Sequence, residues 1–258
     1  MIRTLSTALA AILLHVSMLV PAAMAGSVVL KPMEGDFIAP DFRFGTGEKM
    51  AELKLHYTTL GEPKRDAAGH VTNAVMILHG TGGDERSLLE LGRAAAPGFA
   101  LISPRGRVLE DGQARFFKRF AEGVLDEDDL RFRARELSDF VLAICAQNGL
   151  RAPIAIGFSN GANIAAAMLL LAPHAIAGAA LLRPMQPFQS MPTAQLGGKS
   201  VLIVSGAADQ LSSEETNERL AAHYGGGGAA VCHRRLAAGH SLSESDAIEV
   251  ANWLTTLP

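Results

Sequence analysis

The chain has 258 residues, of which 48% are hydrophobic and 19% are charged, so it can bury a large core and form a single domain. Its net charge of -3 and its lack of any run of Lys and Arg exclude a broad basic surface, so we expect no nucleic-acid partner. The two cysteines, Cys145 and Cys232, form no CxxC pair, which favours free thiols over a disulfide. We expect no metal and no cofactor.

The first residues, 1–25, predict a secretory leader. A basic residue near the start precedes an apolar run, and the small-residue pattern AMA at 23–25 indicates cleavage after Ala25. The apolar run, 5–20, is short for a membrane span and contains polar residues, so we favour cleavage over an N-terminal anchor. The expected mature product, 26–258, is one soluble domain that is periplasmic or secreted, without stable membrane insertion.

Apolar runs after the leader predict a β-sheet. The stretch DFRFGTGEKMAELKLHYTTLGEP, residues 41–63, is typical of two antiparallel strands joined by a Gly-rich turn. Continuous apolar runs then recur, as in parallel strands that are covered on both faces. These runs are NAVMILHG (73–80), 99–103, 154–158, 177–182, 200–205 and 231–236.

Helical patterns lie between these runs. Residues 126–147 carry apolar side chains along one face and acidic residues in the first turn. The closing stretch SESDAIEVANWL begins with Ser243 and Asp246 in the spacing of a capping box. Alternation of strands and helices predicts an α/β fold with a mostly parallel eight-stranded sheet and helices on both faces. Such sheets bind ligands at the carboxyl ends of their strands.

The stretch GFSNG, residues 157–161, joins one apolar run to an alanine-rich helical run. Small residues two positions either side of Ser159 are what a nucleophile elbow needs, because strand and helix must approach closely around the serine. A GxSxG pattern also arises in ordinary turns, but the flanking strand and helix favour the elbow.

A serine nucleophile needs a base and an acid that orients the base. His240, in LAAGHSLSE, lies between the last predicted strand and the last helix, and Asp209, in SVLIVSGAADQL, follows an apolar strand. The alternatives are an exposed loop histidine and a plain turn aspartate. The order Ser159, Asp209, His240, each after a strand, is that of α/β hydrolases.

Stabilisation of an oxyanion needs backbone donors near the serine. LHGTGGDE follows a central strand, and its small residues leave the backbone accessible. We expect the N–H groups of Thr81 and Asn160 to form the oxyanion hole. A phosphate-binding glycine loop is the rival interpretation, but no Lys follows in Walker spacing.

A resemblance to a known family rests on four segments. They are ILHGTGGDERSLLEL, LISPRGRVLEDGQARFFKRFAEGVLDEDDLRFRARELSDFV, GFSNGANIAAAML and GHSLSESD. The sequence resembles the α/β-hydrolase superfamily, in its phospholipase/carboxylesterase branch and close to dienelactone-hydrolase-like carboxylesterases. The resemblance implies Ser159 as nucleophile, Asp209 as acid, His240 as base and Thr81 with Asn160 as oxyanion hole. Dienelactone hydrolases use a cysteine nucleophile, so the serine implies ester hydrolysis. The leader and residues 41–63 are more similar to exported homoserine-acetyltransferase-like hydrolases.

The first hypothesis is therefore a serine carboxylesterase that hydrolyses small to medium or aryl esters through an acyl-enzyme. An acyltransferase with the same triad and a non-catalytic binding protein are the alternatives, and the intact triad disfavours the last. The interval 183–198 has three prolines and is too short for a separate cap domain. We expect minimal or no cap and an open groove rimmed by Met185 and Phe188, which takes a small-molecule ester. The adjacent Phe116 and Phe117 have two interpretations: they line the acyl pocket or, as is more common for adjacent aromatics, one is a core residue and one a surface residue. We expect the second and leave both out of the site.

Overall fold

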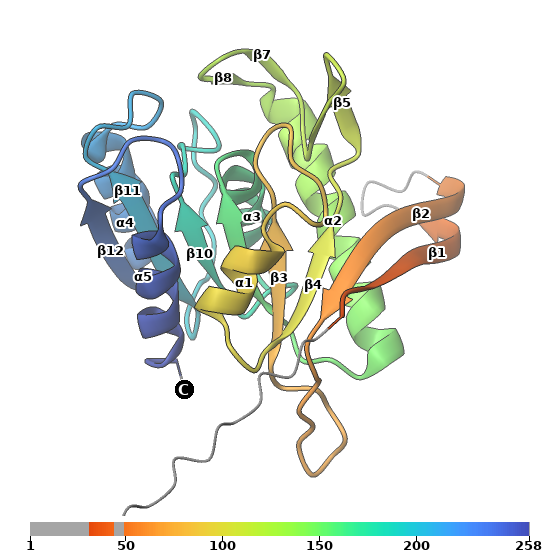
Figure 1. Ribbon diagram of the computed structural model, residues 1–258. Helices are drawn as coiled ribbons and strands as arrows, with labels where there is room; N and C mark the ends of the chain where they lie inside the picture. The colour runs from red at the N-terminus through yellow and green to blue at the C-terminus, as the bar shows by residue number, and fades with distance from the viewer. Residues whose placement is uncertain (1–30, 44–48, 258) are drawn as a thin grey trace, which may run out of the picture.

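The computed structural model describes residues 31–43 and 49–257, and the predicted leader and its cleavage site lie outside them. The chain forms a central eight-stranded sheet in the order β1-β2-β4-β3-β9-β10-β11-β12, with helices on both faces (Figure 1). Its strands are β1 (Met33–Arg43), β2 (Lys49–Leu60), β3 (Ala74–Leu78), β4 (Ala100–Pro104), β9 (Ile154–Phe158), β10 (Gly178–Leu182), β11 (Ser200–Gly206) and β12 (Ala230–Leu236).

Strand directions confirm the predicted mostly parallel sheet, but β1 begins at Met33, well before the stretch 41–63 in which both opening strands were expected. β1 pairs with β2, and β2 with β4, in antiparallel fashion, whereas every pair from β4 to β12 is parallel. The central strands are apolar along their length because both faces are covered: β3 and β10 are buried at every residue. Carboxyl ends of the parallel strands therefore meet along one edge of the sheet.

Two layers of helices cover the sheet and bury two apolar cores. α1 (Leu89–Ala95) and α5 (Glu244–Leu254) contact each other on one face, which buries Trp253 against the sheet. α2 (Glu127–Asn148), α3 (Asn160–Leu171) and α4 (Glu214–Gly226) lie on the other face, over the larger core (Figure 1).

Local signals set the helix ends. The side chain of Asp126 accepts a hydrogen bond from Asp129 N–H at the start of α2. The predicted capping box is present at the start of α5, where the Ser243 N–H donates to the Asp246 carboxylate over 2.8 Å.

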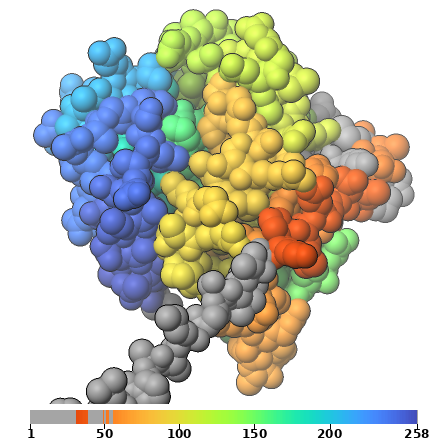
Figure 2. Space-filling view, in the orientation of Figure 1, coloured from red at the N-terminus to blue at the C-terminus, as the bar shows by residue number. Residues whose placement is uncertain are grey.

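Two small hairpins between β4 and α2 were not predicted. β5 (Val108–Glu110) pairs with β6 (Gln113–Arg115), and β7 (Arg119–Ala121) pairs with β8 (Val124–Leu125). They form the top of the molecule in Figures 1 and 2, beyond the strand ends. Their strands are only two or three residues long, too short for a periodic apolar pattern to show in the sequence.

Candidate active site

Ser159 lies in a strained turn between β9 and α3. Its φ is +51°, in the left-handed region that non-glycine residues rarely adopt. A Cβ on Gly157 would lie 2.3 Å from the Gly161 carbonyl oxygen, and one on Gly161 would lie 2.1 Å from the Leu78 carbonyl oxygen. Only glycine fits at either position, so the sequence GFSNG lets strand and helix meet tightly and leaves the Ser159 side chain at the turn.

A chain of two hydrogen bonds joins the three residues that the sequence singled out. His240 Nε2 lies 2.9 Å from Ser159 Oγ, and His240 Nδ1 lies 2.9 Å from Asp209 Oδ2. With Nδ1 protonated and donating to the carboxylate, Nε2 is left as an acceptor for the serine hydroxyl hydrogen. This arrangement suits transfer of the serine proton to the imidazole.

The acid and the base come from two loops that hydrogen-bond to each other. Asp209 follows β11 and His240 lies between β12 and α5. The Ala207 N–H donates to the Leu236 carbonyl, and the Ala208 N–H donates to the Ala238 carbonyl over 2.9 Å. The loops therefore hold the carboxylate and the imidazole in a fixed relation.

The surroundings differ for the two partners. The side chain of Asp209 is fully buried, whereas that of His240 is 28% exposed, and the ring of Phe158 lies against the imidazole at a centroid distance of 5.5 Å. A buried carboxylate gains most from its hydrogen bond, and a partly open imidazole can reach a bound molecule. The site is thus closed behind the acid and open beside the base.

The loop after β3 lies against the elbow. A Cβ on Gly80 would lie 2.8 Å from the ring of Phe158, which shows how closely this loop approaches Ser159. Among the described residues, no backbone carbonyl accepts the Thr81 N–H. The Asn160 N–H belongs to the first residue of α3, where a backbone donor has no intrahelical partner. Both predicted donors thus belong to segments that meet beside the serine.

His79 anchors this loop. Its Nδ1–H donates to the Gly80 carbonyl over 2.7 Å, and its Nε2 accepts from the Gly106 N–H over 2.9 Å. Burial of the ring lowers the pKa of His79 below its ordinary value of 6.5, because the charged form is poorly solvated there. The neutral imidazole is the form that makes both hydrogen bonds.

Comparisons with known proteins agree with this geometry. A family model described as the alpha/beta hydrolase fold matches residues 73–202. Over 187 residues the chain is 41% identical to "Putative hydrolase MhqD" of Bacillus subtilis, covering 72% of this chain and 94% of that protein. The chain belongs to the α/β-hydrolase family.

Two further similarities bear on the branch of this α/β hydrolase. The crystal structure of the Bacillus cereus carboxylesterase superposes with a TM-score of 0.73 at 35% identity, covering 79% of this chain and 95% of that chain. A stretch of 65 residues, 25% of this chain, is 38% identical to the "Probable acyltransferase" of Methanothermobacter thermautotrophicus and covers 20% of that protein.

Residues 114–116, which we call the strap, contact the site in a way that the sequence did not reveal. These three successive residues hydrogen-bond to the predicted oxyanion loop and to the turn at Ser159. The Gly82 N–H donates to the Ala114 carbonyl, Arg115 Nη1 donates to Thr81 Oγ1 over 2.7 Å, and the Phe116 N–H donates to Asn160 Oδ1 over 2.7 Å. The only hint in the sequence is an arginine followed by two phenylalanines, in a motif that carried the family resemblance but no assigned role.

Arg115, the last residue of β6, is buried, and this burial lowers the pKa of its guanidinium. Its Nε lies 3.1 Å from Glu110, which also accepts a hydrogen bond from Arg119. The cation is therefore compensated by Glu110 of the same hairpin, while its Nη1 holds Thr81.

Two expectations about aromatic side chains were wrong. Phe116 and Phe117 are not divided between core and surface, since both are buried. Phe188, expected at the rim of the groove, is only 1% exposed, and the guanidinium of Arg131 lies 4.0 Å from its ring centroid. Their apolar area is removed from water because α2 and its neighbouring loops pack over them.

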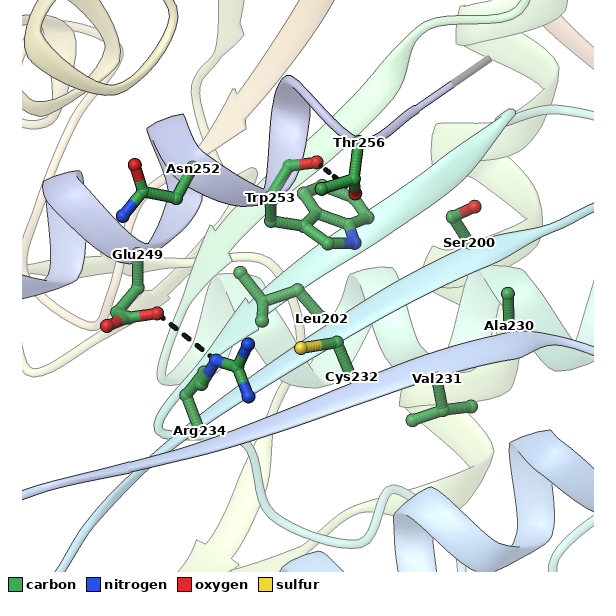
Figure 3. A pocket seen from close by; sticks show the side chains of 10 residues that line it. All are labelled: Ser200, Leu202, Ala230, Val231, Cys232, Arg234, Glu249, Asn252, Trp253 and Thr256. Carbon is green, nitrogen blue, oxygen red and sulfur yellow. Dashed lines mark hydrogen bonds and ion pairs between the residues drawn. The ribbon is translucent and has the colours of Figure 1, made fainter.

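A separate cavity of about 360 Å³ lies between β11, β12 and α5 (Figure 3). Cys232 and Trp253 line it, and Arg234 pairs with Glu249 at 3.4 Å on its wall. It contains none of the predicted site residues, and its cysteine, like Cys145, is a free thiol. The cavity lining holds no histidine next to the thiol, whereas His240 lies beside Ser159 in the candidate site.

Within residues 31–43 and 49–257, no three His, Cys, Asp or Glu side chains gather into a group that would hold a metal ion. In the same ranges, no helix combines the length and hydropathy that a membrane span requires.

Proposed function

We propose that this α/β hydrolase is a serine carboxylesterase that cleaves small to medium or aryl esters through an acyl-enzyme. The observation that carries the proposal is the pair of 2.9 Å contacts that joins Ser159 Oγ, His240 and Asp209 in that order. Similarity to the Bacillus cereus carboxylesterase supports an ester as the substrate.

Each site residue has its own role in the proposed formation of the acyl-enzyme. Ser159 Oγ attacks the ester carbonyl carbon while His240 Nε2 accepts the hydroxyl proton, and Asp209 stabilises the imidazolium through its hydrogen bond to Nδ1. The N–H groups of Thr81 and Asn160 receive the carbonyl oxygen as it becomes negative.

Collapse of the tetrahedral intermediate breaks the bond to the alkoxy oxygen, which takes the proton from His240 and leaves as the alcohol. Water then attacks the acyl carbon of the acyl-enzyme, again with its proton passing to His240. As the bond between the acyl carbon and Ser159 Oγ breaks, His240 returns this proton to Oγ, which releases the acid and free Ser159. No redox step or co-reactant other than water is needed.

The loops around the site favour a small substrate. Between β10 and β11 the chain runs through 183–199 without a helix or strand, so no cap domain is built there. The hairpins of residues 108–125 are the main structure above the strand ends. We propose that rates fall as the acyl chain lengthens and that no activation at an oil–water interface occurs.

The leader pattern adds a proposal about location: the mature protein begins at Gly26 and acts in the periplasm or outside the cell. N-terminal sequencing of the protein from a bacterial periplasmic fraction tests this. Retention of Met1 on the soluble protein would contradict it.

An acyltransferase is the second candidate, because a short stretch of the chain is similar to a protein named as a probable acyltransferase. The triad serves both reactions, since only the group that attacks the acyl-enzyme differs. Alcohols or thiols added to a steady-state assay separate the two. Esterase action predicts free acid as the main product at all acceptor concentrations, whereas a transferase yields mainly acylated acceptor.

The main experiment is hydrolysis of p-nitrophenyl esters from acetate to palmitate by the purified protein. We expect turnover of acetate and butyrate esters and its near-complete loss in Ser159→Ala. Ser205→Ala is the matched control, because it removes a different hydrogen-bonded serine. Absence of turnover across esters of several leaving groups and chain lengths would contradict the proposal.

A further inference from the structure

Arg183 is a fully buried arginine directly after β10, next to the elbow strand. Its φ of +54° lies in the left-handed region, so its backbone is held in place by its surroundings. Both Arg183 and its partner Asp246 have side chains that are 0% exposed. The preceding residue, Leu182, accepts the N–H of Ser159 over 2.9 Å. A buried charge therefore lies one residue from a direct contact with the proposed nucleophile.

The guanidinium joins three segments that carry the site. Its Nη1 and Nη2 donate to the two oxygens of Asp246 in α5, at 2.7 and 3.1 Å. Nη1 also lies 3.2 Å from the Val204 carbonyl in β11. Its Nε donates to the Gly239 carbonyl over 2.8 Å. Gly239 is the residue before His240, so this last bond acts directly on the backbone that presents the imidazole.

The loop between β12 and α5, which carries His240, packs closely against the end of β11 beside the Arg183 guanidinium. A Cβ on Gly206 would lie 2.5 Å from the Gly239 carbonyl oxygen and 3.1 Å from Arg183 Nε. Only glycine lets the loop approach this closely. The Gly239 carbonyl is thus fixed from one side by a guanidinium N–H and bounded on the other by the end of β11.

We propose that Arg183 is a positioning residue for the reaction: its hydrogen bond to the Gly239 carbonyl sets the distance and angle of His240 relative to Ser159 and Asp209. The proposal rests on the proposed function of His240 as the general base. It adds that the base is placed by a buried cation that touches neither substrate nor imidazole.

A purely structural role makes a different prediction. Suppose that the Arg183–Asp246 pair only held α5 against the sheet. Replacing both charges with neutral groups would then leave kcat close to the wild-type value, because no uncompensated charge would remain buried. The double variant Arg183→Met/Asp246→Asn does this. The amide introduced by Asp246→Asn keeps a side-chain oxygen that can accept the Ser243 N–H and preserve the helix cap, whereas the Gly239 carbonyl loses its donor.

The experiment measures kcat, KM and the imidazole signal of His240 in the whole protein. For the double variant we expect a native circular dichroism spectrum, a kcat about 10- to 100-fold lower and a KM within about twofold of wild type, because a displaced base slows chemistry without weakening binding. The low-field proton resonance of His240 Nδ1–H, assigned with His240→Asn, should be lost or shifted. The Tyr224→Leu variant, which removes a buried ring from α4, should lower the melting temperature but keep kcat within about twofold.

A kcat within twofold of wild type in a folded double variant, an unchanged His240 resonance, or an effect on KM alone would each overturn the proposal. If the double variant does not fold, the same measurements on Gly206→Ala test the proposal, since this substitution displaces the Gly239 carbonyl without removing a charge. It should lower kcat and shift the resonance in the same way. Should the wild-type protein cleave no ester, the proposed function fails, but the resonance still tests whether Arg183 places the His240 ring.

Discussion

Within residues 31–43 and 49–257, a serine, a histidine and an acid are hydrogen-bonded together in two places, and the two sets differ in which residue stands in the middle. In the first, His240 stands between Ser159 and Asp209 and uses a different ring nitrogen for each. In the second, Ser205 of β11 is in the middle: its Oγ donates to Glu214 over 3.0 Å and lies 2.9 Å from Nε2 of His233.

The order of the partners decides what each set can do. The Ser205 hydroxyl has one hydrogen and gives it to Glu214, so His233 faces that oxygen as a donor and not as a base. Ser205 is also only 1% exposed inside a strand, whereas Ser159 stands on a strained turn at a strand end. A serine, a histidine and a carboxylate therefore link neighbouring elements in one place and form a proposed catalytic unit in the other.

The largest difference is expected when the two serines are removed in turn. Ser159→Ala should lower kcat/KM for p-nitrophenyl butyrate by about 10⁴-fold or more, because the nucleophile is lost. Ser205→Ala should leave it within about threefold and cost about 1.5 to 3 kcal/mol of unfolding free energy, because the Ser205 hydroxyl donates to a carboxylate, that of Glu214. Steady-state kinetics and urea unfolding measure the two effects. Equal losses of activity would break the distinction between the sets.

The two acids give the next contrast. Asp209→Asn should lower kcat about 10⁴-fold, because an amide favours the wrong imidazole tautomer. Glu214→Gln should keep kcat within about threefold, since Glu214 orients no proposed base. Both variants retain the size of the side chain, so melting temperatures show whether any loss is structural. Full activity of Asp209→Asn would mean that the acid is a different residue.

Only the first set lies beside a candidate oxyanion hole, and the strap of residues 114–116 holds that hole. Arg115→Met should lower kcat by roughly 10-fold, less than the about 10²-fold lost with a whole donor, because the Thr81 N–H remains but loses its support. Arg119→Met is the control, since Arg119 pairs with the same Glu110 without touching Thr81. If both variants lose kcat equally, the effect belongs to the hairpin and not to the contact with Thr81.

The smallest effect concerns pH and His79. Because the pKa of His79 is below 6.5 in the folded chain, the unfolded chain binds more protons between that lowered pKa and 6.5. The free energy of unfolding should therefore decrease as the pH falls below 6.5, by at most about 1.4 kcal/mol per pH unit from this group. Urea titrations between about pH 7 and 5, which span the ordinary imidazole pKa, should show a shallower pH dependence for His79→Gln. An identical pH dependence of the unfolding free energy in both proteins would contradict a contribution from His79.

The sequence predicted the sheet and the helices α2, α3 and α5, but not α1 or α4, because the signals of the predicted elements are local. The parallel strands are continuous apolar runs, and the capping box at Ser243 lies within one helical turn. Glycine spacing around Ser159 likewise predicted a strand ending at Phe158 and a helix beginning at Asn160. The roles of the site residues remain predictions, although the hydrogen bonds among them have the order that the roles require.

Other features depend on contacts that no local pattern encodes. Arg115 and Arg183 look like surface charges in the sequence, but the folded chain buries both of them. Arg115 lies in the β5–β6 hairpin, and Arg183 contacts the loop that carries His240. The hairpins themselves are too short to show a period, and the burial of Phe188 depends on α2, a distant segment. Positioning residues were missed because their partners are far away in sequence.

The most direct test of the central claim is covalent labelling of the folded protein with a fluorophosphonate, followed by peptide mass spectrometry. Attack by a serine oxygen forms a P–O bond and releases fluoride, so the reagent marks an activated serine. We predict a single adduct on Ser159, its absence in His240→Ala, and no adduct on Ser205 in either protein. An adduct on Ser205 or another serine, or labelling of Ser159 that persists without His240, would contradict the proposal. The proposal is that His240, hydrogen-bonded to both Asp209 and Ser159, activates Ser159.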